Sequence, residues 1–358
     1  MKCLFIFFSL LMGLGLSARE PSMKLVDKSF ERKGTKLQHK EWIVKFHHAD
    51  LNLKNTLDSN GKLVKKSWGD FFLGLHHGTL HNGSWDIWHF ISATDKKGKV
   101  MPEAAPVSNV SFVRFADSSC VNMDWDNGTI RVLQTSGSQR WVYVKVTMPA
   151  GINKVTLTLR PGGAHTGIKG RERHIRYGEL DVESRDYKVN TLKVDGSGMA
   201  FYSKNYSEKN GNFLVFESEK IQTIQHHTSN PVYVTFYAKP GVKELNFALG
   251  YFLDEDAEEV IQRFMVEQLP TIRKGLDSIQ WDKAPDFTEF SRNAEQVKYL
   301  ISGYQGAAKA NYEKEFAEIQ KAYEAAKTNN DIPAYTEVLE RLRKLQKNIG
   351  TTALKALM

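Results

Sequence analysis

The sequence contains little cysteine. Of its two cysteines, Cys3 lies within an N-terminal apolar segment, which leaves Cys120 in the rest of the chain. One cysteine cannot form an intramolecular disulfide, and this excludes the disulfide-stapled class of small secreted domains. A chain of 358 residues can bury enough apolar surface without such cross-links. We expect Cys120, in the stretch SSCVNMDW, to be a buried apolar side chain.

Long apolar runs are missing after residue 18. The segment 1–18, MKCLFIFFSLLMGLGLSA, places one lysine before an apolar run and small residues after it. This pattern is typical of a cleavable signal peptide, and its apolar part is too short for a stable membrane span. We therefore expect a secreted or periplasmic protein without a transmembrane span.

Familiar catalytic motifs are missing as well. The sequence has no GxSxG elbow, no Walker phosphate loop and no HExxH zinc motif. A pair of carboxylates for glycoside hydrolysis cannot be selected by spacing alone. The sequence therefore does not decide whether the protein is an enzyme.

Positive charge is concentrated in the first two-thirds of the chain. The formal net charge is +8; residues 19–253 carry 33 Lys and Arg against 23 Asp and Glu, whereas residues 254–358 carry 15 against 18. A cationic surface favours an anionic partner. Because an exported protein seldom meets nucleic acid, we expect an acidic polysaccharide or an anionic cell surface. The alternative is that the charge serves solubility alone.

Residues 41–253 show a β pattern. Short runs rich in Val, Ile, Phe, Tyr and Thr, such as RWVYVKVTM and PVYVTFYAK, are separated by turn signals that include Asn82-Gly83. No helical run interrupts them, so the pattern predicts a mainly β fold, an antiparallel β-sandwich. Residues 19–40 are polar and basic and are interpreted as a tether.

An internal repeat is visible within the β region. Residues 142–159 align without gaps on residues 232–249, each as a strand, a Pro/Gly turn and a returning strand. Two related β-layers or sub-sandwiches would produce this. The alternative is that any sandwich hairpin has such a sequence.

Helical periodicity begins at residue 254. The sequence predicts a helix over 254–274 that Pro270 kinks or ends, then one long helix over about 287–327 and a last helix after Asp331, its N-cap. The short connection predicts an α-helical hairpin with Ile301 and Leu342 in its seam. This hairpin is also a candidate surface for a protein partner.

The stretch 71–90, FFLGLHHGTLHNGSWDIWHF, combines histidines, tryptophans and glycines. His76, His81 and Asp86 could converge on a divalent metal, the one cofactor that the sequence suggests. Histidines without a metal are the commoner case. Trp85 and Trp88 lie in the same stretch, next to its histidines and glycines, and are candidates for stacking on a sugar ring. Trp125 and Trp141, inside alternating strands, are predicted to be core.

The segment 162–181, GGAHTGIKGRERHIRYGELD, is basic and rich in glycine. Arginine forks match carboxylate or sulfate groups, and glycines leave backbone amides accessible. The segment would therefore suit an anionic sugar; a solvated charged hairpin is the alternative. Its candidate ligand contacts are Lys169, Arg171, Arg173, His174, Arg176 and Tyr177.

The leading hypothesis is an exported β-sandwich protein that recognises carbohydrate, with an anionic polysaccharide as ligand. The first alternative is a polysaccharide-active enzyme, a lyase or hydrolase, that uses the His/Trp and Arg-rich segments. The second is a structural envelope protein.

Overall fold

The fold is described by a computed structural model of the chain, which clusters into two compact units, one of residues 1–108 with 124–279 and one of residues 109–123 with 280–358. The predicted signal peptide, residues 1–18, lies outside the described residues. These are 21–64, 71–77, 80–86, 93–94, 100–101, 107–115, 117–125, 128–138, 140–160, 173–183, 189–203, 211–227, 232–251, 257–283, 287–329 and 331–357.

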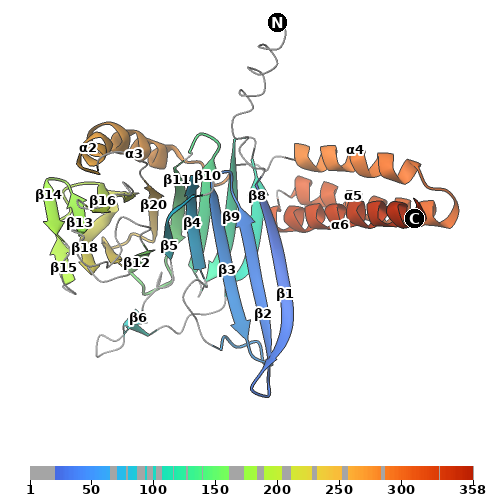
Figure 1. Ribbon diagram of the computed structural model, residues 1–358, viewed down its shortest axis with the longest axis horizontal. Coiled ribbons are helices and arrows are strands. Elements are labelled where there is room, and N and C mark those ends of the chain that lie inside the picture. Colours follow the sequence, from blue (N-terminus) through green and yellow to red (C-terminus); the bar gives the residue numbers. More distant parts are fainter. Residues whose placement is uncertain are drawn as a thin grey trace, which may run out of the picture. The chain divides into compact units, whose positions relative to one another are not determined.

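The first unit contains two large antiparallel sheets (Figure 1). One sheet has the order β1 (Ser22–Arg32), β2 (Thr35–Lys45), β3 (Ala49–Leu57), β4 (Phe71–His77), β5 (Leu80–Asp86), β12 (Lys154–Arg160), β19 (Val232–Ala238), β18 (Ile221–His227) and β15 (Val189–Leu192). The other runs β14 (Leu180–Glu183), β13 (Arg173–Tyr177), β16 (Gly198–Ser203), β17 (Asn212–Phe216), β20 (Glu244–Tyr251), β11 (Trp141–Thr147) and β10 (Gly128–Thr135). A short pair joins β6 (Ala93–Thr94) to β7 (Val100–Met101). The mainly β, antiparallel class is confirmed.

The two sheets bury their apolar faces against each other. Strand β19, VYVTFYA, alternates buried and half-buried residues, as expected for a strand with one face in a core. Its Phe236 ring lies 5.0 Å from the ring centroid of Phe216 and 5.1 Å from that of Phe247, both in the other sheet. All three side chains are fully buried. Aromatic contacts between sheets therefore form the centre of the unit.

The internal repeat corresponds to an approximate twofold relation between the sheets. Each repeat sends one strand into each sheet, so neither repeat is the hairpin that the sequence suggested. The strands pair between repeats with the same register, since Val142 pairs with Leu249 and Val232 pairs with Leu159. The two turns are hydrogen-bonded to each other in equivalent ways. Met148 N donates to Lys243 O over 2.8 Å, and the equivalent Ala238 N donates to Asn153 O over 2.7 Å.

The N-terminal segment is a β-hairpin where the sequence suggested a tether. Strands β1 and β2 pair along eleven residues each and turn at Lys33 and Gly34, both with positive φ. Most of β1 is exposed. Such a strand needs no apolar alternation, and its lysine-rich sequence therefore gave no β signal.

Three helical segments close the first unit: α2 (Ala257–Arg263), the π-helical turn η3 (Phe264–Gln268) and α3 (Leu269–Ser278). Pro270 does not end the helix. It lies in the first turn of α3, and the helical run continues through it directly from the π-helical turn η3. Ile261, Phe264, Ile272 and Leu276 are buried, so this helical run covers apolar surface.

The second unit contains three long helices, with hairpin strands from β8 (Ser108–Arg114) and β9 (Ser118–Trp125). The helices are α4 (Thr288–Ser302), α5 (Gly306–Thr328) and α6 (Ile332–Leu357). The long helix predicted over 287–327 is thus two helices, because the chain breaks around Gly303 and Gly306, the latter at φ 63°. Asp331 caps α6 as predicted, accepting from Ala334 N at 3.0 Å.

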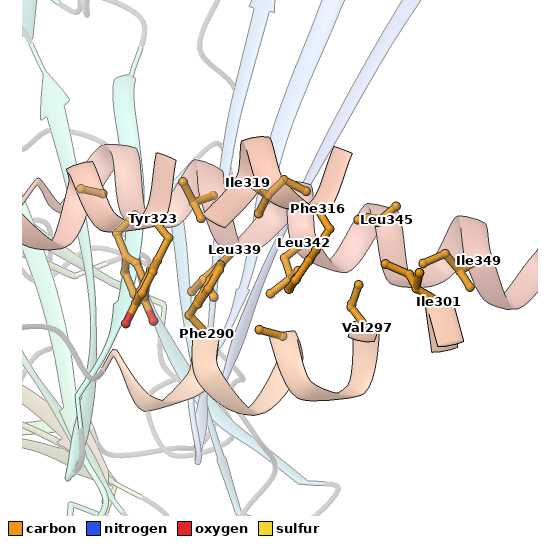
Figure 2. Packing of buried hydrophobic residues seen from close by; sticks show 14 residues of the cluster. Phe290, Val297, Ile301, Phe316, Ile319, Tyr323, Leu339, Leu342, Leu345 and Ile349 are labelled. Carbon is orange, nitrogen blue, oxygen red and sulfur yellow. The ribbon is translucent and has the colours of Figure 1, made fainter. Parts of the chain in front are cut away.

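A shared core holds the three helices together (Figure 2). Phe290 of α4 stacks on Tyr323 of α5 with ring centroids 3.8 Å apart, and Leu342 and Ile301 lie in the same buried cluster. The predicted seam is confirmed, although three helices share it. In the described part of the chain no helix is long and apolar enough to span a bilayer.

Polar contacts join these helices to the hairpin of the same unit. Glu289, 5% exposed, lies 2.6 Å from Arg343 Nη2 and 3.5 Å from Arg114 Nη1. Thr336 donates to the carbonyl of Phe112 at 2.8 Å. Lys283 donates to Asp117, and this hydrogen bond holds the pKa of that carboxyl below its usual value. The hairpin is therefore part of the helical unit, although more than 150 residues separate them in sequence.

Leu342→Ala tests the helical core. Leu342 is 0% exposed, so the variant should lose about 2–5 kcal/mol of unfolding free energy through lost apolar contacts and a cavity. Denaturant titration of the exported chain measures the change. Tyr299, 79% exposed, supplies the control, since Tyr299→Ala should stay within about 0.5 kcal/mol of wild type. Similar losses in both variants would contradict the packing described.

Candidate functional site

The His/Trp stretch forms a β-hairpin. Asn82-Gly83, predicted as its turn, lies inside β5 instead, because β4 ends at His77 and β5 starts at Leu80. His76 is directly opposite His81 in the ladder, whereas Asp86 is opposite Phe72. Five residues of strand separate His81 from Asp86, about 17 Å of backbone. This backbone spacing does not bring the three predicted metal ligands together. Trp85 pairs with Leu73 and Leu159, and Trp88 lies outside the described residues.

The Arg-rich segment is described in part. Lys169 and Arg171 lie outside the described residues, and Arg173 begins β13. On β13 the His174 ring lies 2.8 Å from Asp181 Oδ1 through Nδ1, and Tyr202 donates its hydroxyl to Asp181 Oδ2 at 2.6 Å. A carboxylate so placed fixes the orientation of an imidazole. His174 is 7% exposed and Arg176 is half-buried on the same strand.

The Tyr177 side chain, predicted as a ligand contact, is buried in this structure. Its side chain is 0% exposed, and its ring stacks on Phe216 with centroids 6.2 Å apart. Its hydroxyl accepts from the amides of Asp195 and Gly196 and donates to the Gly196 carbonyl. Burial raises the pKa of Tyr177, although the backbone hydrogen bonds oppose that shift. The Tyr177 hydroxyl therefore holds the loop at Asp195 and Gly196 in place through these hydrogen bonds.

One acidic cluster has a spacing that could hold a cation. Glu217, Glu219 and Asp277 each offer an oxygen within 4.8 Å of the others. Arg273 forms ion pairs with both Glu219 and Asp277, and Lys220 lies 2.8 Å from Glu217. These cations already neutralise the carboxylates, so the cluster is better explained as an ion-pair network.

A pocket of about 490 Å³ opens beside Trp141, at the start of β11. Arg140 lies just before β11 and Trp141 is its first residue, while η3 and α3 contribute the remaining helical residues of the lining. The volume lies within the range of small-molecule sites. Indole, guanidinium, carboxylate and amide groups meet here. The lining residues are Gly137, Arg140, Trp141, Glu267, Gln268, Thr271 and Ile272.

Arg140 and Glu267 are the two charged residues that line this pocket, and their charges are opposite. Next to Arg140, Tyr251 donates its amide to the Arg140 carbonyl at 3.2 Å. Burial raises the pKa of Tyr251 to about 12, and the Arg140 charge opposes that rise. The Trp141 Nε1 donor is buried and makes no hydrogen bond within the described part of the chain.

The sequence did not single out this pocket. Trp141 was predicted to be core because it begins the alternating strand WVYVKVT, and the structure places it half-buried. Glu267 and Gln268 come from a helical turn more than 120 residues away. The Arg-Trp pair directly after a turn was the one available signal.

Comparison with known proteins gives no family. No protein family and no curated protein matches the chain. Among similar solved structures, an active YidC insertase is 11% identical (TM-score 0.31), covering 92% of this chain and 64% of that one. The periplasmic domain of Thermotoga maritima YidC is 13% identical (TM-score 0.31), covering 72% and 98%. A proposed aldose 1-epimerase from Klebsiella pneumoniae is 10% identical (TM-score 0.35), covering 72% and 90%. Similarity this low assigns no function.

Tyr177→Phe tests the structural role of that hydroxyl. The variant should lose about 1–2 kcal/mol of unfolding free energy, because the amides of Asp195 and Gly196 lose their acceptor. Thermal unfolding measures the loss, and Tyr299→Phe, at an exposed position, is the matched control. A stable Tyr177→Phe variant with weakened glycan binding would instead make Tyr177 a ligand contact.

Proposed function

We propose that the protein is an exported carbohydrate-binding protein whose ligand is an anionic polysaccharide, and that the Trp141 pocket holds one acidic sugar unit. The observation that carries this is the presence of Trp141 and Arg140 side by side in a pocket of about 490 Å³. An indole suits the apolar face of a sugar ring, and a guanidinium suits its carboxylate.

The two groups recognise different parts of the same sugar. The C–H face of a pyranose packs on an aromatic ring, which supplies apolar contact with fixed geometry. A uronate carboxylate accepts two parallel hydrogen bonds from one guanidinium, a geometry that lysine cannot reproduce. Glu267, Gln268 and Thr271, which also line the pocket, can bond sugar hydroxyls.

The local backbone also favours a binding role. Glu267 and Gln268 belong to η3, a π-helical turn between two α-helical segments. Such turns are rare and are often found at functional sites. The π turn changes which residues face the pocket relative to a continuous α-helix.

The Arg-rich segment extends the proposal. Lys169, Arg171, Arg173 and Arg176 would add long-range attraction for a polyanion, since residues 19–253 carry the whole positive excess. Replacing Arg171 and Arg173 by Ala should weaken polysaccharide binding less than loss of Arg140 does, and the weakening should diminish as salt is raised. Binding isotherms at two ionic strengths measure both effects.

Arg140→Gln tests the pocket itself. The change should weaken binding of oligogalacturonate at least tenfold, about 1.4 kcal/mol, because the carboxylate loses its bidentate partner. Calorimetry measures the affinity, with a neutral glucan as negative control. Arg140→Lys should recover only part of the loss.

The matched control is Arg292→Gln on the exposed face of α4, which removes the same charge elsewhere. If Arg140→Gln and Arg292→Gln bind oligogalacturonate alike, the pocket is not the site. If wild type binds neither alginate nor pectate at low salt, the proposed function is wrong and the structural envelope role stands.

A polysaccharide-active enzyme is the second candidate, favoured by one observation. His174 is oriented by Asp181 at 2.8 Å, the arrangement in which an imidazole serves as general acid or base. A lyase would release unsaturated uronates that absorb in the ultraviolet. Such absorbance with wild type, and its loss with His174→Gln, would favour this candidate over binding alone.

A further inference from the structure

A second pocket, of about 710 Å³, lies where the two repeats cross between the sheets of the first unit. Its walls are the two equivalent turns and one residue of β18. The residues that line it are Met148, Pro149, Ala150, Gly151, Ile152, Asn153, Gln222, Ala238, Lys239, Pro240, Gly241, Val242 and Lys243.

The two turns have the same backbone geometry. Ile152 N donates to Pro149 O and Val242 N donates to Lys239 O, each over 3.1 Å. Gly151 has φ 81° and Gly241 has φ 83°, as at the third position of a type II turn. The amides of these two glycines take no part in the turn hydrogen bonds.

The charge of the pocket has one sign. Its lining contains Lys239 and Lys243 and no carboxylate. The neighbouring Glu244 is already engaged, 2.9 Å from Lys145 Nζ and hydrogen-bonded to Thr147. Glu217 is likewise held by Lys220 at 2.8 Å. An anion in the pocket would meet two ammonium groups, glycine amides and the side-chain amides of Asn153 and Gln222.

The approximate twofold relation shows that the cations are specific to one repeat. Lys239 is equivalent to Pro149, and Lys243 is equivalent to Asn153, by the alignment of residues 232–249 on 142–159. The scaffold of paired turns is shared, whereas the lysines are found on the second turn alone. The turn geometry itself therefore does not require the lysines.

We propose that this pocket binds a tetrahedral oxyanion, a sulfate or phosphate ester carried on a sugar. Lysine acts on such groups as a point charge with rotatable donors, while backbone amides in turns form anion-binding concavities. The volume exceeds that of a lone oxyanion and accommodates a sugar attached to it. This site is separate from the Trp141 pocket and has different chemistry, so it does not depend on uronate binding.

The experiment titrates the exported chain with galactose 6-sulfate, galactose 6-phosphate, inorganic sulfate and galactose by calorimetry at low salt. We expect binding of a charged sugar, weaker binding of inorganic sulfate and none of galactose. The double variant Lys239→Gln/Lys243→Gln should bind the charged sugar at least tenfold more weakly. This double variant should still bind oligogalacturonate as wild type does, because neither lysine lines the Trp141 pocket, and this separates the two sites.

The matched control is Lys193→Gln/Lys274→Gln, which removes two exposed charges elsewhere in the same unit. Melting temperatures of both double variants should equal that of wild type. Amide chemical shifts of Gly151 and Gly241 should move on titration. Absence of binding by wild type, or equal binding by the two double variants, would overturn the proposal. The relative affinities for sulfate and phosphate esters identify the oxyanion.

Discussion

The paired crossing of the chain between its two sheets is the constraint on which the first unit depends. Each repeat must leave one sheet and enter the other, and the two turns fix each other through the Met148–Lys243 and Ala238–Asn153 hydrogen bonds. This pairing sets the register of β11 on β20 and of β12 on β19. Phe236 can then meet Phe216 and Phe247, because a one-residue slip would turn it away from the core.

Both candidate ligand pockets follow from this arrangement. The interior between the sheets is filled by aromatic and aliphatic side chains, so space for a ligand arises where strands end. The Trp141 pocket lies at the start of β11, and the lysine pocket lies at the turn that follows the same strand. Strand β11 thus has the pocket with Arg140 and Trp141 at its first residue and the pocket with Lys239 and Lys243 at the turn after its last residue.

The sequence predicts those features that produce a periodic apolar pattern. The antiparallel β class, the capping of α6 by Asp331 and the burial of Leu342 follow from alternation or helical spacing. Strand β1 was missed because it is exposed on both faces. The helix break at Gly303 was missed because the helical spacing of apolar residues continues across it. Tyr177 lies two residues after buried Ile175 on β13, so both side chains are on the same face of the strand. The alternation of side chains along the strand therefore favours a buried Tyr177 over a ligand contact. The Trp141 pocket needs residues distant in sequence, which no local pattern brings together.

The helical unit is discontinuous in sequence, and this affects how the protein can be made. The hairpin residues 109–123 leave the ribosome more than 150 residues before Gln280, an interval of roughly 8–30 s at ordinary synthesis rates. During that time Arg114 lacks the carboxylate of Glu289, and the carbonyl of Phe112 lacks the hydroxyl of Thr336. A shortened gene that ends at residue 279 would keep this hairpin permanently in that state. The two units therefore cannot be separated by dividing the chain at a single position.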